Sequence, residues 1–134
     1  MTEPVEQERA AGVEVNLARD GKVSYMQIPA ADAVALGTFY EKVFGWEVGG
    51  RPGHVSFRDA SGEMIGAFVS NLAPATEPGV LPYIYVQGLD AAVQRIRENG
   101  GRVVREPYPE GDLWVATFRD PAGNVMGLWQ AGGR

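Results

Sequence analysis

Few side chains in this chain can carry out chemistry, and their types limit what that chemistry is. The sequence has no cysteine, which excludes thiolate nucleophiles, disulfides and cysteine-ligated zinc. Its single histidine, His54, has the side chain whose ordinary pKa lies nearest neutrality, so it is a candidate for moving a proton. A lone histidine is also commonly structural or exposed. Proton transfer by His54 or by a tyrosine therefore remains an alternative. A metal site of two or three histidines within one chain is excluded.

The charge and hydropathy of the chain restrict its partners. The 134 residues carry 12 Lys and Arg against 17 Asp and Glu, a formal net charge of -5. Phosphate backbones need a basic face, so we predict no nucleic-acid partner. No apolar run approaches the length that spans a membrane, and the first residues, MTEPVEQERAAG, lack the apolar core of a signal peptide. We therefore predict a cytoplasmic protein that has no membrane partner.

The same motif occurs twice, as FRDASGEMIGAF at residues 57–68 and as FRDPAGNVMGLW at residues 118–129. Each copy reads Phe-Arg-Asp, then a short turn that ends in Gly, then an apolar strand. Asp at the first position and Gly at the fourth suit a type I turn, and Pro121 favours that turn in the second copy. We expect two β-hairpins in which Asp59 and Asp120 are turn residues.

The elements that position these hairpins also repeat in order. Alternation predicts strands, Asp32 and Asp90 are candidate N-caps of two helices, and Gly45 is a natural helix stop. The expected elements are a strand at 22–28, a helix at 33–45, strands at 46–48, 54–59 and 63–70, then a strand at 81–87, a helix at 91–99, and strands at 102–107, 113–120 and 124–130. The chain then divides into a loose N-terminal extension (1–21), a first βαβββ module (22–70), a linker (71–79), a second module (80–130) and a tail (131–134).

Three strings of the sequence carry a resemblance to a known superfamily. They are YMQIPAADAVALGTFYEKVFGWEV, YIYVQGLDAAVQRIRENGGRVV and FRDPAGNVMGLWQ, within residues 22–130. This doubled βαβββ pattern resembles the vicinal oxygen chelate superfamily, which includes glyoxalase I, bleomycin-resistance proteins and extradiol dioxygenases. The resemblance implies an α+β fold of two tandem modules whose mixed sheets curl into an open barrel around a cavity. It is specific for the superfamily but not for one activity, because function belongs to the site.

The resemblance also marks where a divalent metal would be held in metal-dependent members. Those members use a His or Gln on each module's first strand and a Glu on each module's last strand. The corresponding residues here are Tyr25, Leu81, Gly66 and Gly127, and none is a good ligand for such an ion. We therefore predict no metal and no other cofactor. A metalloenzyme with displaced carboxylate ligands is a lesser alternative.

Strand alternation selects the side chains that would line the cavity. On the face of the ligand positions we expect Tyr25, Gln27, Met64, Phe68, Tyr83, Tyr85 and Trp129. His54 and Trp114 lie on neighbouring strands whose register the sequence does not settle. Such a lining suits a flat, partly apolar molecule held by stacking and a few hydrogen bonds. The competing interpretation is that these aromatic residues simply fill a packed barrel.

Two functions are compatible with this lining. The first is a metal-free small-molecule-binding protein of the glyoxalase/bleomycin-resistance type, which holds an aromatic or partly apolar ligand and performs no reaction. The alternative is a metal-free enzyme of the lyase or isomerase type, in which a tyrosine, Gln27 or His54 would place or move a proton. The resemblance further implies a homodimer, with each barrel built either within one chain or across two.

Overall fold

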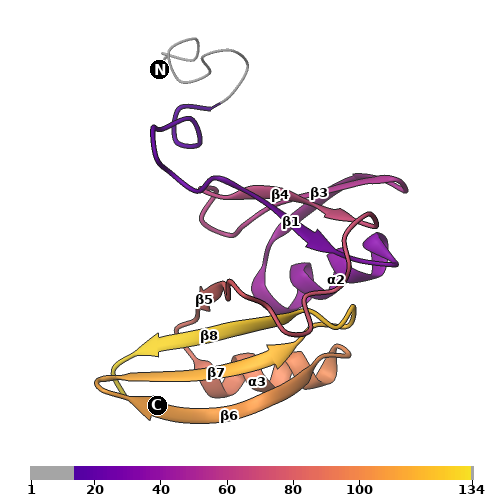
Figure 1. Cartoon of the computed structure of the whole chain (residues 1–134). Helices are drawn as coiled ribbons and strands as arrows, with labels where there is room; N and C mark the ends of the chain where they lie inside the picture. The colour runs from indigo at the N-terminus through magenta and orange to yellow at the C-terminus, as the bar shows by residue number, and fades with distance from the viewer. Residues whose placement is uncertain (1–13, 134) are drawn as a thin grey trace.

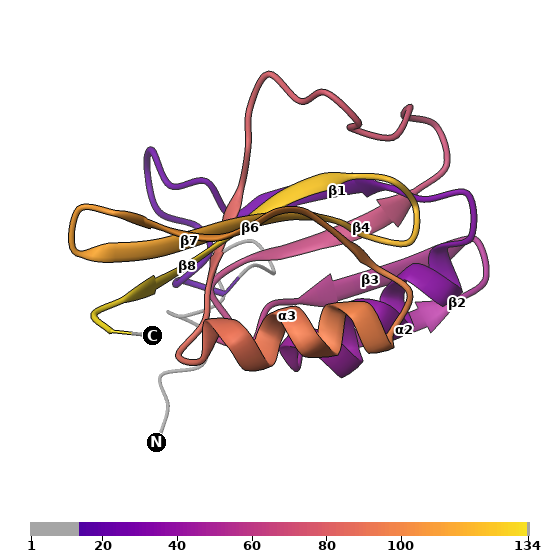
Figure 2. The same cartoon turned by 90° about the horizontal axis from the view of Figure 1, so that it is seen from below.

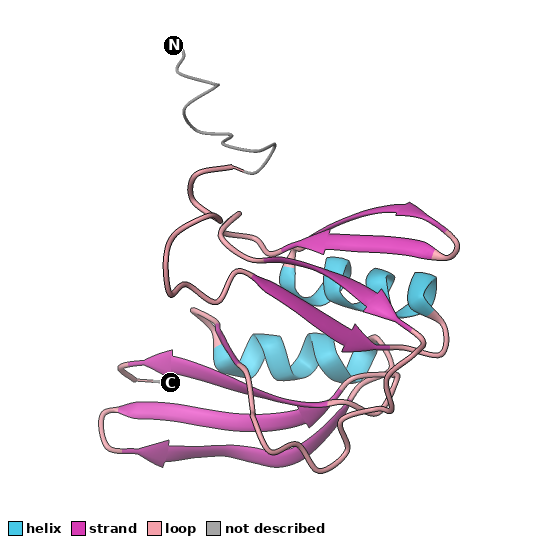
Figure 3. Cartoon of the chain, turned by 45° about the horizontal axis from the view of Figure 1, so that its top comes forward, coloured by secondary structure: helices cyan, strands magenta, loops and turns pink. Residues whose placement is uncertain are grey.

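The computed structural model describes residues 14–133, which form two mixed four-stranded sheets and two helices (Figures 1 and 3). The first module contains β1 (Tyr25–Pro29), α2 (Ala33–Phe44), β2 (Glu47–Arg51), β3 (His54–Arg58) and β4 (Ile65–Val69). The second contains β5 (Tyr83–Tyr85), α3 (Leu89–Glu98), β6 (Arg102–Glu110), β7 (Leu113–Arg119) and β8 (Val125–Ala131). The strand orders are β1-β4-β3-β2 and β5-β8-β7-β6, so the two modules share one topology. The α+β prediction of two βαβββ modules is confirmed, although the sheets do not close into a barrel.

Local capping explains where the first helix begins and ends. The Asp32 side chain accepts a hydrogen bond from the Ala35 N–H, and Gly45 ends the helix in the left-handed conformation at φ 72°. The predictions that Asp32 caps α2 and that Gly45 ends it are confirmed. The prediction for α3 is wrong, because the helix begins at Leu89 after Gly88 and not after Asp90. The Leu89 N–H donates instead to the buried side chain of Gln130 on β8, so a distant residue supplies the acceptor.

Both helices lie on the same side of the molecule, and each packs against the sheet of its own module (Figure 2). A single core joins the modules, and α2 reaches the second one through Phe39, whose ring lies 6.2 Å from that of Phe118. We call the sheet faces turned away from the helices the open faces. Among the described residues, no helix is both long and apolar enough to cross a membrane. Residues 1–13 of the predicted extension lie outside the described residues; Leu17 beyond them is buried.

A buried polar network fastens the second hairpin to the first module. The Tyr40 hydroxyl donates to Asp120 Oδ2 at 2.8 Å, and Asn124 Nδ2 donates to the Pro29 carbonyl at 2.8 Å. Asn124 Oδ1 also accepts from the N–H of Ala75 in the linker. Burial raises the pKa of Asp120, and burial together with the Asp120 charge raises the pKa of Tyr40 well above its ordinary 10.0. Asp120 is thus a turn residue that also holds two modules together.

Replacing Tyr40 with phenylalanine is expected to change how stability depends on alkaline pH. The folded protein holds the Tyr40 proton more tightly than the unfolded chain, so stability falls as pH rises above 10.0, by up to about 1.4 kcal/mol per pH unit. At neutral pH, Tyr40→Phe removes one donor from the buried Asp120 and costs about 1–3 kcal/mol. Urea unfolding from pH 7 upward should show this difference shrinking above pH 10.0. A difference that stays constant would contradict the raised pKa.

Candidate functional site

The two copies of the repeated motif form hairpins of different length. The Asp59 N–H donates to the Met64 carbonyl, whereas the Asp120 N–H donates to the Asn124 carbonyl, so the first loop is one residue longer. As a result Arg58 pairs with Ile65, while Arg119 pairs with Val125. A shift of one residue turns every side chain of a strand to the other face. Equivalent residues of β4 and β8 therefore point in opposite directions relative to their helices.

This reversal corrects the expected lining in the first module. Tyr25 and Gln27 pair with Ile65 and Ala67 on the open face. Phe68, expected beside them, pairs with Ile28 on the helix side and is buried in the core against Tyr40. The prediction that Phe68 and Tyr25 share a face is wrong, because the longer hairpin loop shifts β4 by one residue.

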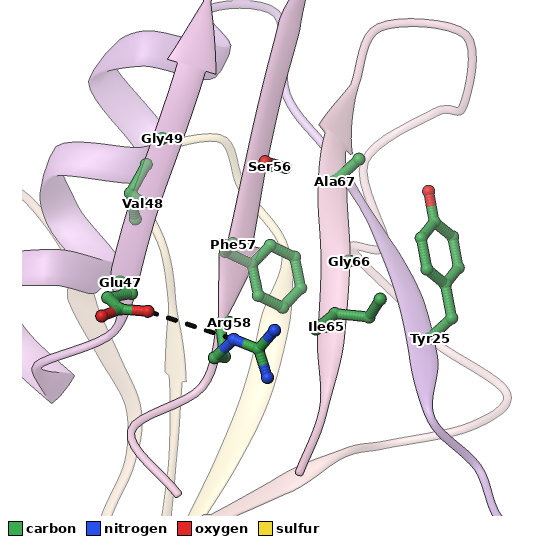
Figure 4. Close-up of a pocket in the computed structure, with 10 residues that line it drawn as sticks. All are labelled: Tyr25, Glu47, Val48, Gly49, Ser56, Phe57, Arg58, Ile65, Gly66 and Ala67. Carbon is green, nitrogen blue, oxygen red and sulfur yellow. Dashed lines mark ion pairs between the residues drawn. The ribbon is translucent and has the colours of Figure 1, made fainter. Parts of the chain in front are cut away.

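The first open face carries a shallow pocket of about 560 Å³ (Figure 4). Tyr25 stands at one side of it and Glu47 at the other, with Arg58 between strands. The Arg58 guanidinium contacts Glu14 and Glu47 and donates to the Gly62 carbonyl. Its charge is therefore already balanced by two carboxylates of the chain, which makes this pocket a poor anion site.

The second open face holds an aromatic surface, here named the aromatic face. Pairing places Tyr85, Trp129, Val115 and Tyr108 in one row across the sheet, and Tyr83, Gly127, Thr117 and Arg105 in the next. The rings of Tyr85 and Trp129 meet edge to face at 4.7 Å, and the Arg105 guanidinium lies 3.4 Å from the centre of the Tyr108 ring. Tyr83 and Tyr85 are about half exposed, at 46% and 47%. Three predicted residues, Tyr83, Tyr85 and Trp129, thus lie together.

Sequence reasoning missed Arg105 and Tyr108, the members of the aromatic face that β6 supplies. The pairing of β6 with β7 shifts register between Val103 and Arg105 and again between Arg105 and Tyr108. These irregularities interrupt the alternation, so period-two counting cannot place either side chain. Pro107, which lies inside the irregular segment, was the available signal, because proline within a strand marks an edge or a bulge.

The remaining candidates lie apart from the aromatic face. Trp114 pairs with Gln130 on the helix side of β7 and packs against the core. His54 begins β3, pairs with Arg51 and is exposed. Met64 precedes β4 and borders a groove between the modules. The structure therefore divides the predicted lining among separate surfaces.

The positions that the resemblance assigns to metal ligands do not fit a divalent ion. Tyr25 lies on the open face of its module, whereas Gly66 lies on the helix side, buried against Phe57. In the second module Gly127 lies beneath the Tyr83 ring. Across residues 14–133 no group of three or more His, Cys, Asp or Glu side chains is arranged to hold a metal. The donor set thus offers no basis for a reaction step through a metal.

Comparison with known proteins places these features in context. The profile of a glyoxalase-like domain matches residues 25–129. "Putative glyoxylase CFP32" of Mycobacterium bovis and Mycobacterium tuberculosis is 32% identical over 123 residues, which cover 84% of this chain and 47% of the relative. The chain therefore spans about half the length of the curated relatives it matches.

Solved structures share the fold over most of the chain. TnmS3, an antibiotic-binding protein from Streptomyces sp. CB03234, is 25% identical with a TM-score of 0.65, covering 86% of this chain and 98% of its own. A glyoxalase/bleomycin resistance protein/dioxygenase family enzyme from Burkholderia phytofirmans has a TM-score of 0.68 at 21% identity, over 81% of this chain and 97% of its own. At 21% identity, the likeness to the Burkholderia protein shows the fold alone.

Proposed function

This chain belongs to the glyoxalase-like domain family, and from that premise we propose that it binds an aromatic or partly apolar small molecule against its aromatic face without a metal. Membership of this family and the antibiotic-binding relative TnmS3 support a small-molecule-binding role. The type of ligand is inferred from the residues of the aromatic face. We propose that the protein binds this ligand and catalyses no reaction on it.

The observation that carries the proposal is the row formed by Tyr85, Trp129 and Tyr108 on an open sheet. Tyr85 is about half exposed, and Trp129 and Tyr108 are partly buried. Rings that strand pairing holds in place present flat apolar area at little entropic cost. Gly127 leaves the Tyr83 ring lying close to the sheet, because a Cβ there would be 2.4 Å from Tyr83 Cδ2. A planar ligand can stack on such a surface, and Arg105 can extend the stack by a cation–π contact.

We further propose that a second copy of the chain supplies the opposite wall. The aromatic face is open on one side, since Tyr83 and Tyr85 remain about half exposed. Pockets for small molecules enclose most of the ligand surface, so an open sheet alone would hold a ligand weakly. Sedimentation of the protein with and without ligand tests this homodimer, and a monomer that keeps full affinity would contradict it.

The binding proposal is tested by calorimetric titration with acridone, a neutral planar tricycle. Trp129→Leu and Tyr85→Leu should each weaken binding about tenfold, because truncating a central aromatic anchor costs about 1–2 kcal/mol. Val80→Ala is the control, since Val80 is 83% exposed and lies outside the aromatic face. Its affinity should match that of the unaltered protein. Equal affinities for all four proteins would overturn the proposed site.

A further inference from the structure

A second concave site lies between the modules, beside β5. It is a groove of about 840 Å³, which is within the range of pockets that hold drug-sized ligands. Its walls come from the C-terminal end of α2, the first hairpin loop, β5 and α3. We call it the inter-module groove. It shares Tyr83 and Tyr85 with the border of the aromatic face, but its floor is built from different residues.

The floor of the groove is apolar and adaptable. All three methionines of the described residues, Met26, Met64 and Met126, line it, and Phe44 and Trp46 add aromatic surface. Methionine side chains are unbranched and polarizable, so they adjust to ligands of different shape and make favourable contacts with aromatic rings. These residues come from segments as far apart in the sequence as β1, α2, the first hairpin loop and β8, so only the folded chain forms the surface. The floor fits a flat apolar body.

Among the described residues that line the groove, Arg95 is the one cation, and its guanidinium has N–H groups without a partner. Arg95 on α3 donates from Nε to the Val43 carbonyl at 3.1 Å, near the C-terminal end of α2. That bond anchors the guanidinium where the last helical carbonyls favour positive charge. Within residues 14–133 its two η nitrogens make no hydrogen bond or ion pair. A guanidinium with a free pair of N–H groups matches a carboxylate in a two-pronged contact.

Within the part of the chain that the structure describes, Asp59 is the only carboxylate that borders the groove, and its hydrogen-bonding capacity is already used. Asp59 accepts hydrogen bonds from the Ser61 hydroxyl and from the N–H groups of Glu63 and Met64. Asp59 is therefore held within its own turn, and among the described ion pairs none joins it to Arg95. The unbalanced charge at the groove is positive, although the chain as a whole carries a net charge of -5. A local cation in an acidic protein favours an anionic ligand at that place.

From these contacts we propose that the inter-module groove binds an aromatic carboxylate, with its ring system over the methionines and its carboxylate on Arg95. This charged ligand differs from the neutral planar ligand proposed for the aromatic face, and the two sites share only Tyr83 and Tyr85 among their described residues. The methionine floor supplies contact area, and the guanidinium supplies orientation. The two contributions predict different responses to substitution.

The test uses 2-naphthoate and its neutral isostere 2-naphthamide as probes on the full chain. Calorimetric titration should show naphthoate binding at least tenfold more tightly than naphthamide. Arg95→Gln should reduce naphthoate to the affinity of naphthamide and leave naphthamide unchanged, whereas Arg95→Lys should retain part of the preference. Arg97→Gln is the matched control on the same helix, because Arg97 pairs with Glu106 and does not border the groove. Equal affinities of the unaltered protein for both probes would overturn the proposal.

A second measurement locates the probe directly. With 13C-labelled methionine methyl groups, naphthoate should shift the signals of Met26, Met64 and Met126 together and saturate with the calorimetric affinity. The Trp129 indole signal reports the aromatic face, so a shift confined to Trp129 would overturn the groove assignment. Acridone binding that depends on Trp129 is measured separately, so failure of either site is distinguishable from failure of the other. Thermal unfolding of each variant establishes that it is folded before titration.

Discussion

Gly66→Ala is expected to destabilise the protein by about 3 kcal/mol or more, at the upper end of the usual cost of overpacking. A Cβ at this position would lie 2.0 Å from the carbonyl oxygen of Met26 and 2.3 Å from Cζ of Phe57. The Met26 oxygen belongs to the backbone of β1, which is paired with β4, so relief requires the two strands to separate. The midpoint and slope of urea unfolding give the loss of free energy.

Gly127→Ala is the matched control, because Gly127 occupies the same place in the second copy of the motif. The three nearest atoms to a Cβ there all belong to the Tyr83 ring, which is about half exposed and can turn aside. We expect a cost of about 1 kcal/mol or less, together with a changed position of Tyr83 on the aromatic face. Equal losses from the two alanine substitutions would show that the one-residue difference in hairpin register is wrong.

The second large effect is expected from Asp120→Ala, at about 3–4 kcal/mol of lost unfolding free energy. The substitution leaves the Tyr40 hydroxyl and the N–H groups of Ala122 and Asn124 without their acceptor. Each unsatisfied buried group costs about 1–3 kcal/mol. Removing a buried carboxylate also offsets part of the lost free energy, because burial disfavours the charged form of Asp120, as its raised pKa indicates. Three orphaned donors outweigh that gain.

Asp59→Ala tests whether this cost comes from the network or from the turn. Among the described residues, Asp59 bonds only within its own loop, to Ser61, Glu63 and Met64, where solvent can replace it. We expect a loss of about 1 kcal/mol, similar to the removal of a helix cap. Combining Asp120→Ala with Tyr40→Phe should cost less than the sum of the two single changes, since both remove the same hydrogen bond. Additive losses would argue against that bond.

Much of the fold followed from local patterns in the sequence. Asp32 and Gly45 bound a helix because a short polar side chain and a residue without Cβ satisfy the two helix ends locally. The FRD motifs mark hairpins because Asp and Gly suit the turn. The prediction for Asp90 failed because Gln130, 41 residues away from Leu89, provides the acceptor that the helix start needs. A local pattern contains no information about such a partner.

The sequence by itself determined the doubled βαβββ order, the two hairpins, and the lack of metal-ligating side chains at the positions that the resemblance marks. Turn chemistry and alternation depend on neighbouring residues only, so they can be read without the fold. The tertiary structure alone decided that Phe68 faces the core while Trp129 faces outward, that Tyr40 bonds to Asp120, and that Met26, Met64 and Met126 meet in one groove. Alternation along a strand predicts which side chains share a face. Whether that face is the helix side or the open face depends on one additional loop residue and on the packing of the helices on the sheet.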